Sequence, residues 1–243
     1  MKTRQEKLEA FGRILDILDE LRVKCPWDRE QTTQSLRPQT IEEVYELSDA
    51  ILKDDMKNIS KELGDVLLHV LFYAKIGEEQ NEYDIVDVIN FLSDKLIYRH
   101  PHVFSSVEVA DSAEVVKNWE MLKTKEKDGN RRILSGVPDT LPPLLKAYRM
   151  QDKARGVGFD WEEKSQVWDK VKEEMNEYQA ELDAIEAAES EEDRAVAFAR
   201  AEVELGDYLF AVVNAARLYG LNPDTALERT CAKFKRRFTY LEE

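Results

Sequence analysis

The sequence is poor in the residues that cross-link a chain or anchor it in a membrane. Its two cysteines, Cys25 and Cys231, lie near opposite ends and form neither a metal-ligand spacing nor a disulfide framework, so a reducing compartment suits them. The longest apolar stretch, Val66 to Ala74, includes His69 and is far too short to span a bilayer. The first residues also lack the apolar segment of a signal peptide. These absences predict a cytoplasmic protein without a membrane segment.

Positive charge is also scarce. The chain has 35 Lys and Arg residues against 50 Asp and Glu residues, which gives a formal net charge of -15. A surface this negative repels the backbone of DNA and RNA, and no recognised reader motif is present, so we expect no nucleic-acid partner. An acidic protein that handles phosphate groups must do so locally, with metal ions and a concentrated basic patch.

Helical periodicity dominates the chain. Near the N-terminus apolar residues recur at steps of three and four, as Leu8, Phe11, Ile14, Leu15, Leu18 and Leu21. Similar segments cover roughly residues 39–53, 56–78, 84–99, 111–126, 143–154, 163–188, 192–219 and 223–241. Gly220 and then Asn222-Pro223 supply the stop and start signals between the last two segments. No stretch shows the sustained alternation of a β-strand, so the sequence predicts an all-α fold.

One stretch, from about Thr124 to Pro143, gathers glycine, proline and charge, which indicates a connector. We therefore divide the chain into a helical domain at 1–123, a linker at 124–142 and a second helical domain at 143–243. A second polar stretch, at 189–193, interrupts a long helical hairpin. Ser190 is placed there to cap the helix that follows.

The two domains repeat one pattern of charged residues, and this repeat is the most informative feature of the sequence. The first domain has Glu42-Glu43-Val-Tyr-Glu46, then Glu62-Leu-Gly-Asp65, then Lys95-Leu-Ile-Tyr-Arg99. The second has Glu173-Glu174-Met-Asn-Glu177, then Glu204-Leu-Gly-Asp207, then Lys233-Phe-Lys-Arg-Arg237. A Trp/Asp pair precedes each set, as Trp27-Asp28 and Asp160-Trp161.

The spacing of the carboxylates predicts two metal sites. Residues three apart share a helix face, so Glu174 points with Glu177, and Glu204 points with Asp207. If the two helices pair antiparallel, four carboxylates converge and repel one another unless a cation is present. Mg²⁺ is the hard ion that suits such oxygen ligands, and Mn²⁺ is a substitute for it. The corresponding set in the first domain is Glu43, Glu46, Glu62 and Asp65.

A single Glu-x-x-Asp pair is usually only a solvated helix face, so the repeat carries the argument. Gly64 and Gly206 strengthen it, because a glycine inside a helix costs about 1 kcal/mol relative to alanine. Their presence predicts that a neighbouring helix or a ligand approaches the backbone at these two positions. Recurrence of the entire set makes coincidence improbable.

The densest cationic patch follows the second carboxylate set, as Lys233, Lys235, Arg236 and Arg237. Beside a magnesium site, such cations neutralise the charge of a triphosphate. The alternative is that basic residues near a helix end interact with the helix dipole.

These motifs, in this order, resemble the MazG family of all-α nucleoside triphosphate pyrophosphohydrolases. The tandem arrangement resembles the two-domain members of that family over nearly the full chain. The segments that carry the resemblance are Cys25-Pro-Trp-Asp28, Arg99-His-Pro-His-Val-Phe104, Gly158-Phe-Asp-Trp161 and Lys233-Phe-Lys-Arg-Arg-Phe238. The resemblance implies hydrolysis of a nucleoside triphosphate to a monophosphate and pyrophosphate, dependence on Mg²⁺, and a homodimer of helical bundles. It also implies metal ligands at Glu174, Glu177, Glu204 and Asp207, and phosphate contacts at Lys170, Lys233, Arg236 and Arg237.

The second domain is better equipped for a triphosphate. The repeat places Ile97 and Tyr98 opposite Lys235 and Arg236, and it places Gln39 and Ile41 opposite Lys170 and Lys172. Asn214 is a further polar candidate, because the first domain has Phe72 there. It could bind sugar, base or a metal-bound water, or it could form an interhelical hydrogen bond. We therefore expect the second domain to be the main catalyst.

In the expected mechanism one carboxylate orients or deprotonates the attacking water, while metal and basic helix stabilise the phosphates. The catalytic candidates are Glu173, Glu174 and Glu177, and the sequence leaves the base open between Glu173 and Glu177. The competing hypothesis is a non-catalytic helical module that senses nucleotides or binds a partner. His69 could approach the first carboxylate set but corresponds to Ala211, and we interpret His100 and His102 as structural. A di-iron site is excluded, because it requires Glu-x-x-His pairs that the sequence lacks.

Overall fold

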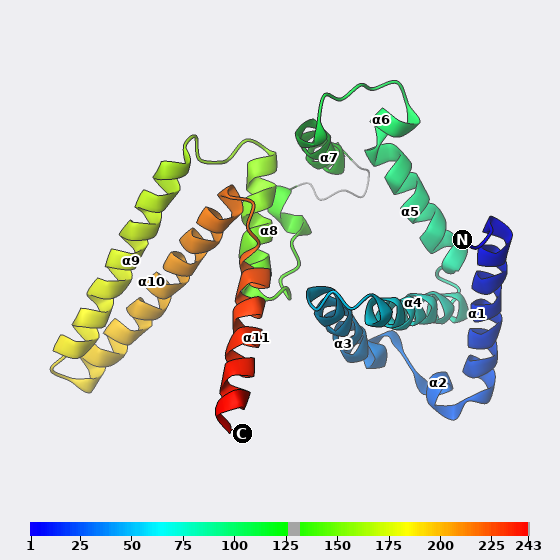
Figure 1. The fold of residues 1–243 in the computed structure, drawn as a ribbon, viewed down its shortest axis with the longest axis horizontal. Helices are drawn as coiled ribbons and strands as arrows, with labels where there is room; N and C mark the ends of the chain where they lie inside the picture. The colour runs from blue at the N-terminus through cyan, green and yellow to red at the C-terminus, as the bar shows by residue number, and fades with distance from the viewer. Residues whose placement is uncertain (126–131, 243) are drawn as a thin grey trace. The chain divides into compact units, whose positions relative to one another are not determined.

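The computed structural model describes residues 1–125 and 132–242, which contain helices and no strands. The prediction of an all-α fold is therefore confirmed. In chain order the elements are α1 (Arg4–Lys24), α2 (Pro26–Glu30), α3 (Thr33–Leu52), α4 (Met56–Glu79), α5 (Ile85–Arg99), α6 (Pro101–Phe104), α7 (Ser112–Lys125), the 3-10 helix η1 (Ile133–Gly136), α8 (Pro143–Gly156), α9 (Lys164–Ala187), α10 (Glu191–Leu218) and α11 (Pro223–Glu242) (Figure 1). Within the described ranges, every helix is too short or too polar to cross a membrane.

The chain forms two compact units, here called unit 1 (Met1–Tyr98) and unit 2 (Arg99–Glu243). This boundary falls at the end of α5, upstream of the predicted linker at 124–142. Residues 126–131 of that linker lie outside the described residues, and its remainder includes η1. Compactness is a different property from the sequence repeat, so the domain limits 1–123 and 143–243 stay a prediction.

Unit 1 is built around the α3–α4 hairpin, with α1 packed against α4. Its core consists of buried Leu18, Leu36, Leu71, Phe72 and Ile76. Arg22 on α1 ties the unit together, because its guanidinium pairs with Glu79 at the end of α4 and lies over the ring of Phe72. Gly77 is required by close packing, since an added Cβ would lie 2.7 Å from the ring and the carbonyl oxygen of Tyr83.

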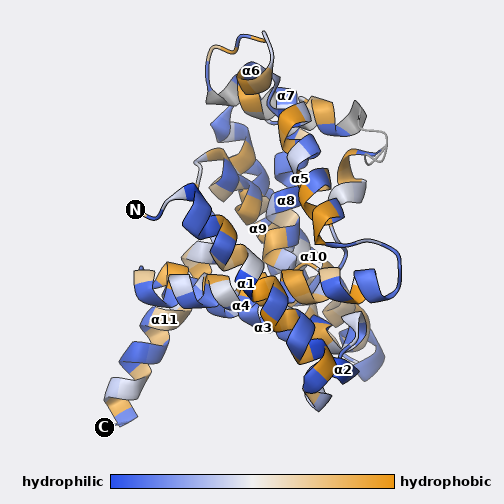
Figure 2. Ribbon diagram, turned by 90° about the vertical axis from the view of Figure 1, so that its right-hand side faces the viewer, coloured by the Kyte–Doolittle hydropathy of each residue, from blue (hydrophilic) through white to orange (hydrophobic). Residues whose placement is uncertain are grey.

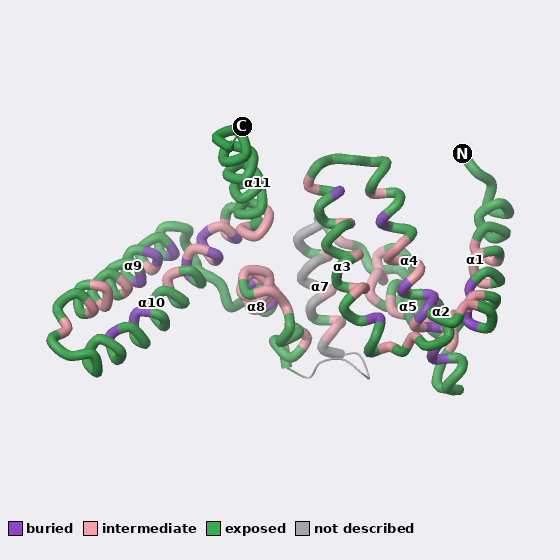
Figure 3. Tube along the Cα trace, turned by 90° about the horizontal axis from the view of Figure 1, so that it is seen from below, coloured by how far each residue is buried: buried purple, intermediate pink, exposed green. Residues whose placement is uncertain are grey.

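Unit 2 is built around the α9–α10 hairpin, whose two helices run side by side along most of their length (Figure 1). The apolar seam between them is formed by buried Val167, Val171, Ala211 and Ala215. Helix α8 packs against α10, and α11 contacts both α8 and α10. Beyond Thr225, however, α11 is exposed up to residue 242 (Figure 3). Both hydrophobic and hydrophilic residues recur along it (Figure 2).

The start and stop signals around α10 are confirmed. The Ser190 hydroxyl accepts a hydrogen bond from the backbone N–H of Asp193, as expected of an N-cap. Gly220 has a φ of +72°, the left-handed conformation that ends a helix, and the Asn222 side chain caps α11 at Thr225. The predicted start of the second helix, near residue 39, is wrong. Helix α3 begins at Thr33 because Thr32 and Ser35 form a reciprocal capping box, which outweighs Pro38 in the second turn.

Candidate active site

The structure brings carboxylates together in each hairpin. In unit 2, Glu174 and Glu177 from α9 and Glu204 from α10 have carboxylate oxygens within 4.8 Å of one another. In unit 1, Glu43 from α3 meets Glu62 and Asp65 from α4 within the same limit. We call these groups the unit 2 trio and the unit 1 trio. Each exists because a short turn returns the chain antiparallel and because the spacing of acids matches the helical repeat.

Two of the predicted ligands lie beside the trios rather than in them. Asp207 follows Glu204 by one turn of α10 and lines a pocket together with Glu174. Glu46 lines a smaller pocket together with Glu62. The geometry therefore gathers three carboxylates closely in each unit and keeps a fourth within the same hairpin. That any of them binds a metal ion stays a prediction.

The pKa values of the trios reflect crowding of negative charge. Desolvation and the charges of Glu174 and Glu204 raise the pKa of Glu177 above its usual range. Desolvation and the charges of Asp65 and Glu46 likewise raise the pKa of Glu43. A raised carboxylate pKa means that the ionised form is disfavoured, and a bound cation would reverse this. The electrostatics thus fit a cation site in both units.

Lysines partly neutralise both trios. In unit 2, the Lys170 ammonium lies 2.7 Å from a Glu174 oxygen and 2.9 Å from a Glu173 oxygen, and these bonds raise the pKa of Lys170. In unit 1, Lys61 lies 3.0 Å from Glu62. As the repeat predicted, unit 1 has Gln39 rather than a lysine opposite Lys170. The role of Lys61 was not predicted, because this residue is on α4 and Val203 stands at the corresponding position of unit 2.

The buried carboxylate of Glu62 gives independent support for a cation site in unit 1. Its side chain is buried, and its Oε2 atom has no hydrogen-bond partner among the described residues. A buried carboxylate oxygen without a partner is strongly disfavoured. Its two partners in the unit 1 trio, Glu43 and Asp65, are also carboxylates, a donor set that suits a hard cation rather than a soft one.

Unit 2 has a pocket of about 490 Å³ that runs from its carboxylates into an apolar interior. It is lined by Leu134, Met150, Gln151, Ala154, Phe159, Asp160, Trp161, Val167, Lys170, Glu174, Asp207, Phe210, Ala211, Asn214 and Arg217. Charged residues from α9 and α10 are therefore continuous with an aromatic wall from the loop after α8. We call this the unit 2 pocket. It has the mixed lining of a small-molecule site.

Arg217 organises the inner end of this pocket. Its guanidinium is buried and donates to both carboxylate oxygens of Asp160 and, at 2.8 and 3.0 Å, to Oδ1 of Asn214. Burial raises the pKa of Asp160, but the hydrogen bonds from Arg217 lower it, and the net result is a pKa below the usual value. Asn214 thus makes a hydrogen bond within its own helix through its oxygen, while its Nδ2 group has no partner among the described residues.

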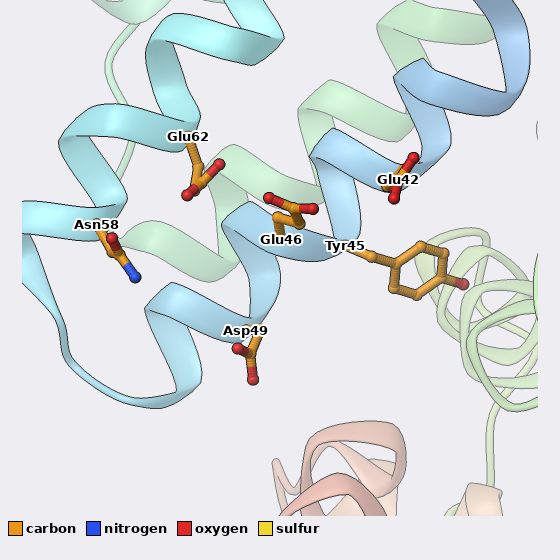
Figure 4. Close-up of a pocket in the computed structure, with 6 residues that line it drawn as sticks. All are labelled: Glu42, Tyr45, Glu46, Asp49, Asn58 and Glu62. Atoms are coloured by element: carbon orange, nitrogen blue, oxygen red, sulfur yellow. The ribbon is translucent and has the colours of Figure 1, made fainter.

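The corresponding pocket of unit 1 is different in kind. It measures about 370 Å³ and is lined by Glu42, Tyr45, Glu46, Asp49, Asn58 and Glu62. Figure 4 shows Glu46 and Asp49 of α3 across from Glu62 and Asn58 of α4. Phe72, opposite Asn214 in the repeat, is buried in the core. The pocket at Glu62 is therefore an acidic groove with one aromatic side chain in its lining.

The basic helix does not join the carboxylates within the chain. Lys233, Arg236 and Arg237 are exposed on α11. Both arginines line a separate pocket with Tyr240 and Leu241, and none of the three cations lines the unit 2 pocket. Helix α11 contacts α8 and α10, and its basic residues lie in the part of the helix that stays exposed. Their contact with phosphate stays a prediction.

A neighbouring helix does not approach Gly64 or Gly206, because a Cβ added at either would meet no atom within 4 Å. His69 is hydrogen-bonded to Thr40 at 2.9 Å, and burial lowers its pKa despite the charge of Asp65. His100 packs against His102 and against Trp119, as expected for a structural role.

Residues 31–104 match the MazG nucleotide pyrophosphohydrolase domain. The chain is 40% identical to the nucleoside triphosphate pyrophosphohydrolase of Escherichia coli (strain K12), over 97% of this chain and 88% of that protein. It is 39% identical to the nucleoside triphosphate pyrophosphohydrolase/pyrophosphatase MazG of Thermotoga maritima, over 96% of this chain and 86% of that protein. It is 46% identical to the uncharacterized protein YabN of Bacillus subtilis (strain 168), over 99% of this chain and 48% of that protein.

Proposed function

This chain belongs to the MazG nucleotide pyrophosphohydrolase family, and from that premise we propose that it hydrolyses nucleoside triphosphates to monophosphates and pyrophosphate with Mg²⁺. We assign the reaction to unit 2. The observation that carries the assignment is that Glu174 of the unit 2 trio and the adjacent Asp207 line a pocket of about 490 Å³ with an aromatic wall. Unit 1 has a comparable trio, and the pocket at its Glu62 measures about 370 Å³ and is lined mainly by acidic side chains.

Glu174, Glu177, Glu204 and Asp207 are the residues that would hold the metal. Their carboxylate oxygens are the ligands that Mg²⁺ prefers, and Mn²⁺ would substitute for it. When bound, the ion draws charge from the phosphate oxygens and relieves the repulsion within the trio. Glu174 is already buried, so its charge is weakly solvated and depends on a cation for stability.

Two carboxylates remain candidates for activating water. Glu173 lies outside the trio and is held by Lys170 at 2.9 Å, so both its oxygens become available once the lysine turns to a phosphate. Glu177 is in the trio, so it would accept the proton on an oxygen that the metal does not occupy. In either case the proton moves from water to a carboxylate oxygen, and Lys170 stays close enough to neutralise the phosphate charge.

The proposal includes a homodimer. On α10, Val203 and Leu209 are exposed hydrophobic residues on either side of Gly206, which has open space beside it. All three lie on one face of the helix. A helix from a second copy would fill that space and cover this apolar strip. Sedimentation of the full chain is the test, and a monomer at micromolar concentration would exclude this part.

The reaction itself is tested by product analysis. Purified chain is incubated with a mixture of nucleoside triphosphates with Mg²⁺, with Mn²⁺, or with EDTA, and pyrophosphate and orthophosphate are quantified separately. Pyrophosphate as the first product, lost with EDTA, is expected. Orthophosphate as the first product would contradict the proposal, and no release of either would favour the non-catalytic nucleotide-sensing module.

A matched pair of variants assigns the reaction to a unit. Glu174→Gln and Glu43→Gln make the same change at corresponding positions of the two trios. We expect Glu174→Gln to lower kcat/KM more than about 100-fold, because even changes outside the ligand set of metal sites cost about 10–100-fold. Glu43→Gln should leave most activity. Loss in Glu43→Gln alone would reverse the assignment.

A further inference from the structure

We propose that Gln151 selects nucleobases in the unit 2 pocket by accepting a hydrogen bond from an exocyclic amino group. The inference rests on the proposed function for the class of ligand and goes beyond it in naming the group that is recognised. Gln151 is on α8 and lines the pocket, and it is 7% exposed. No part of the carboxylate chemistry uses it.

The orientation of the Gln151 amide is fixed by its surroundings. Its Nε2 donates a hydrogen bond of 2.8 Å to the backbone carbonyl of Phe210 on α10. A carbonyl can only accept, so turning the amide around would set two oxygens against each other. The amide nitrogen is thus occupied, and Phe210 lies three residues beyond Asp207 on the same helix.

The other end of the amide has no partner. Oε1 of Gln151 is buried and makes no hydrogen bond with any described residue. Buried amide oxygens are normally paired, and one that is not destabilises the protein on its own. A ligand N–H that reaches this atom gains a hydrogen bond without displacing another. The pocket therefore contains an acceptor that a ligand can satisfy.

The length of the pocket places a base near this acceptor. From Glu204 in the unit 2 trio to Phe210, whose carbonyl holds Gln151, the α10 backbone rises about 9 Å, given the 1.5 Å rise per residue of an α-helix. A nucleotide whose phosphates lie at the carboxylates would extend its sugar and base along this line, toward Phe210 and Gln151. Phe159 and Trp161 provide apolar surface for the faces of the ring. The edge of the base then faces the polar side chains of the pocket, among them Gln151 and Asn214.

A lone, recessed acceptor distinguishes between kinds of base edge. An exocyclic amino group projects beyond the ring and brings only hydrogens toward Oε1. In uracil and thymine the ring N–H is flanked by two carbonyl oxygens, which would approach Oε1 together with it and repel it. Adenine, cytosine and guanine therefore fit, whereas uracil, thymine and bases that have lost the amino group do not.

The decisive comparison uses two substrates that differ by one amino group. ATP and purine ribonucleoside triphosphate are hydrolysed by the full chain with Mg²⁺, and kcat/KM is measured for each by pyrophosphate release. We expect the wild type to prefer ATP about tenfold, the worth of one buried hydrogen bond. Gln151→Met, similar in volume but without an acceptor, should lower the ratio to about one by losing activity on ATP. CTP and UTP form a second pair.

The control makes the same exchange elsewhere. Gln179 is exposed on α9, and Gln179→Met should keep the wild-type preference. Circular dichroism establishes that each variant folds, and Gln151→Leu, which likewise lacks an acceptor, should lower the ratio to about one if Gln151→Met does not fold. Equal kcat/KM for the two purines in the wild type, or an unchanged ratio in a folded Gln151→Met, would overturn the inference.

Failure of the proposed function would look different. If the wild type released pyrophosphate from no triphosphate, calorimetric binding of the same two nucleotides would decide the inference alone. Tighter binding of ATP that Gln151→Met abolishes would support base selection by Gln151 in a non-catalytic site. Equal binding, or no binding, would overturn it.

Discussion

Replacing Asp160 by Asn tests whether the inner end of the unit 2 pocket is held by charge. Asp160 forms a two-pronged pair with Arg217, whose side chain is 4% exposed while that of Asp160 is 23% exposed. Removing one member of a buried pair costs about 3–5 kcal/mol, because the other charge is left without its partner. Since Asp160 is partly solvated, we expect the lower end, about 3 kcal/mol. For a unit of this size, that corresponds to a fall in Tm of about 6–12 °C.

The assay is differential scanning calorimetry of the full chain, with unfolding of unit 1 as an internal reference. Asp152→Asn is the control, because the bridges of Asp152 to Arg149 and Arg155 lie nearer the surface and should contribute less than about 1 kcal/mol. If Asp160→Asn and Asp152→Asn lowered the stability of unit 2 equally, the reasoning would be refuted.

Acid pH gives a second, independent readout for Asp160. Its pKa in the folded chain is lowered from the ordinary aspartate value of 3.8, so its ionised form contributes stability above that value. The contribution is lost as pH falls through the folded pKa. The difference in stability between the wild type and Asp160→Asn should therefore shrink below about pH 4. A difference that stays constant down to pH 3 would mean that packing, not charge, holds Arg217.

Two further predictions concern the hairpins. Gly77→Ala should destabilise unit 1 by about 1–3 kcal/mol in urea unfolding, because the new Cβ would clash with Tyr83. Gly64→Ala, where space is open, should stabilise the isolated chain by up to about 1 kcal/mol, and a loss there would show that something covers this position. Because the pKa of Glu177 is raised, protons should compete with the metal at a higher pH than for an ordinary glutamate. Manganese titrations between pH 5 and 8 should show affinity falling as pH falls, and Glu177→Gln should flatten that dependence.

Local signals in the sequence were sufficient for the helices and for much of the candidate site. Apolar residues spaced three and four apart predicted the long helices. Ser190 and Asn222 cap the helices that they were expected to cap. The two trios followed from the same periodicity, because hairpin pairing needs only a short turn. Features that depend on residues within one or two turns of a helix can therefore be predicted from the sequence.

Contacts between distant residues could not be predicted in this way. Arg217 and Asp160 are 57 residues apart, and Gln151 and Phe210 are 59 residues apart. Each pair depends on where α8 and its following loop pack against α10, which no local pattern specifies. The position of α11 also depends on such contacts, because α11 packs against α8 and α10. The start of α3 was placed near residue 39 because the capping box of Thr32 and Ser35 was not recognised.

Lys170 occupies Glu173 and Glu174 when no metal does, so it acts as an internal counter-ion. A divalent ion arriving at Glu174 would compete with that ammonium group and release it toward the phosphates. We therefore expect the ion and the nucleotide to reinforce each other, each tightening the binding of the other by the same factor. Nucleotide titrations with and without the ion, repeated on Lys170→Met, would measure how much of that cooperativity passes through this one side chain.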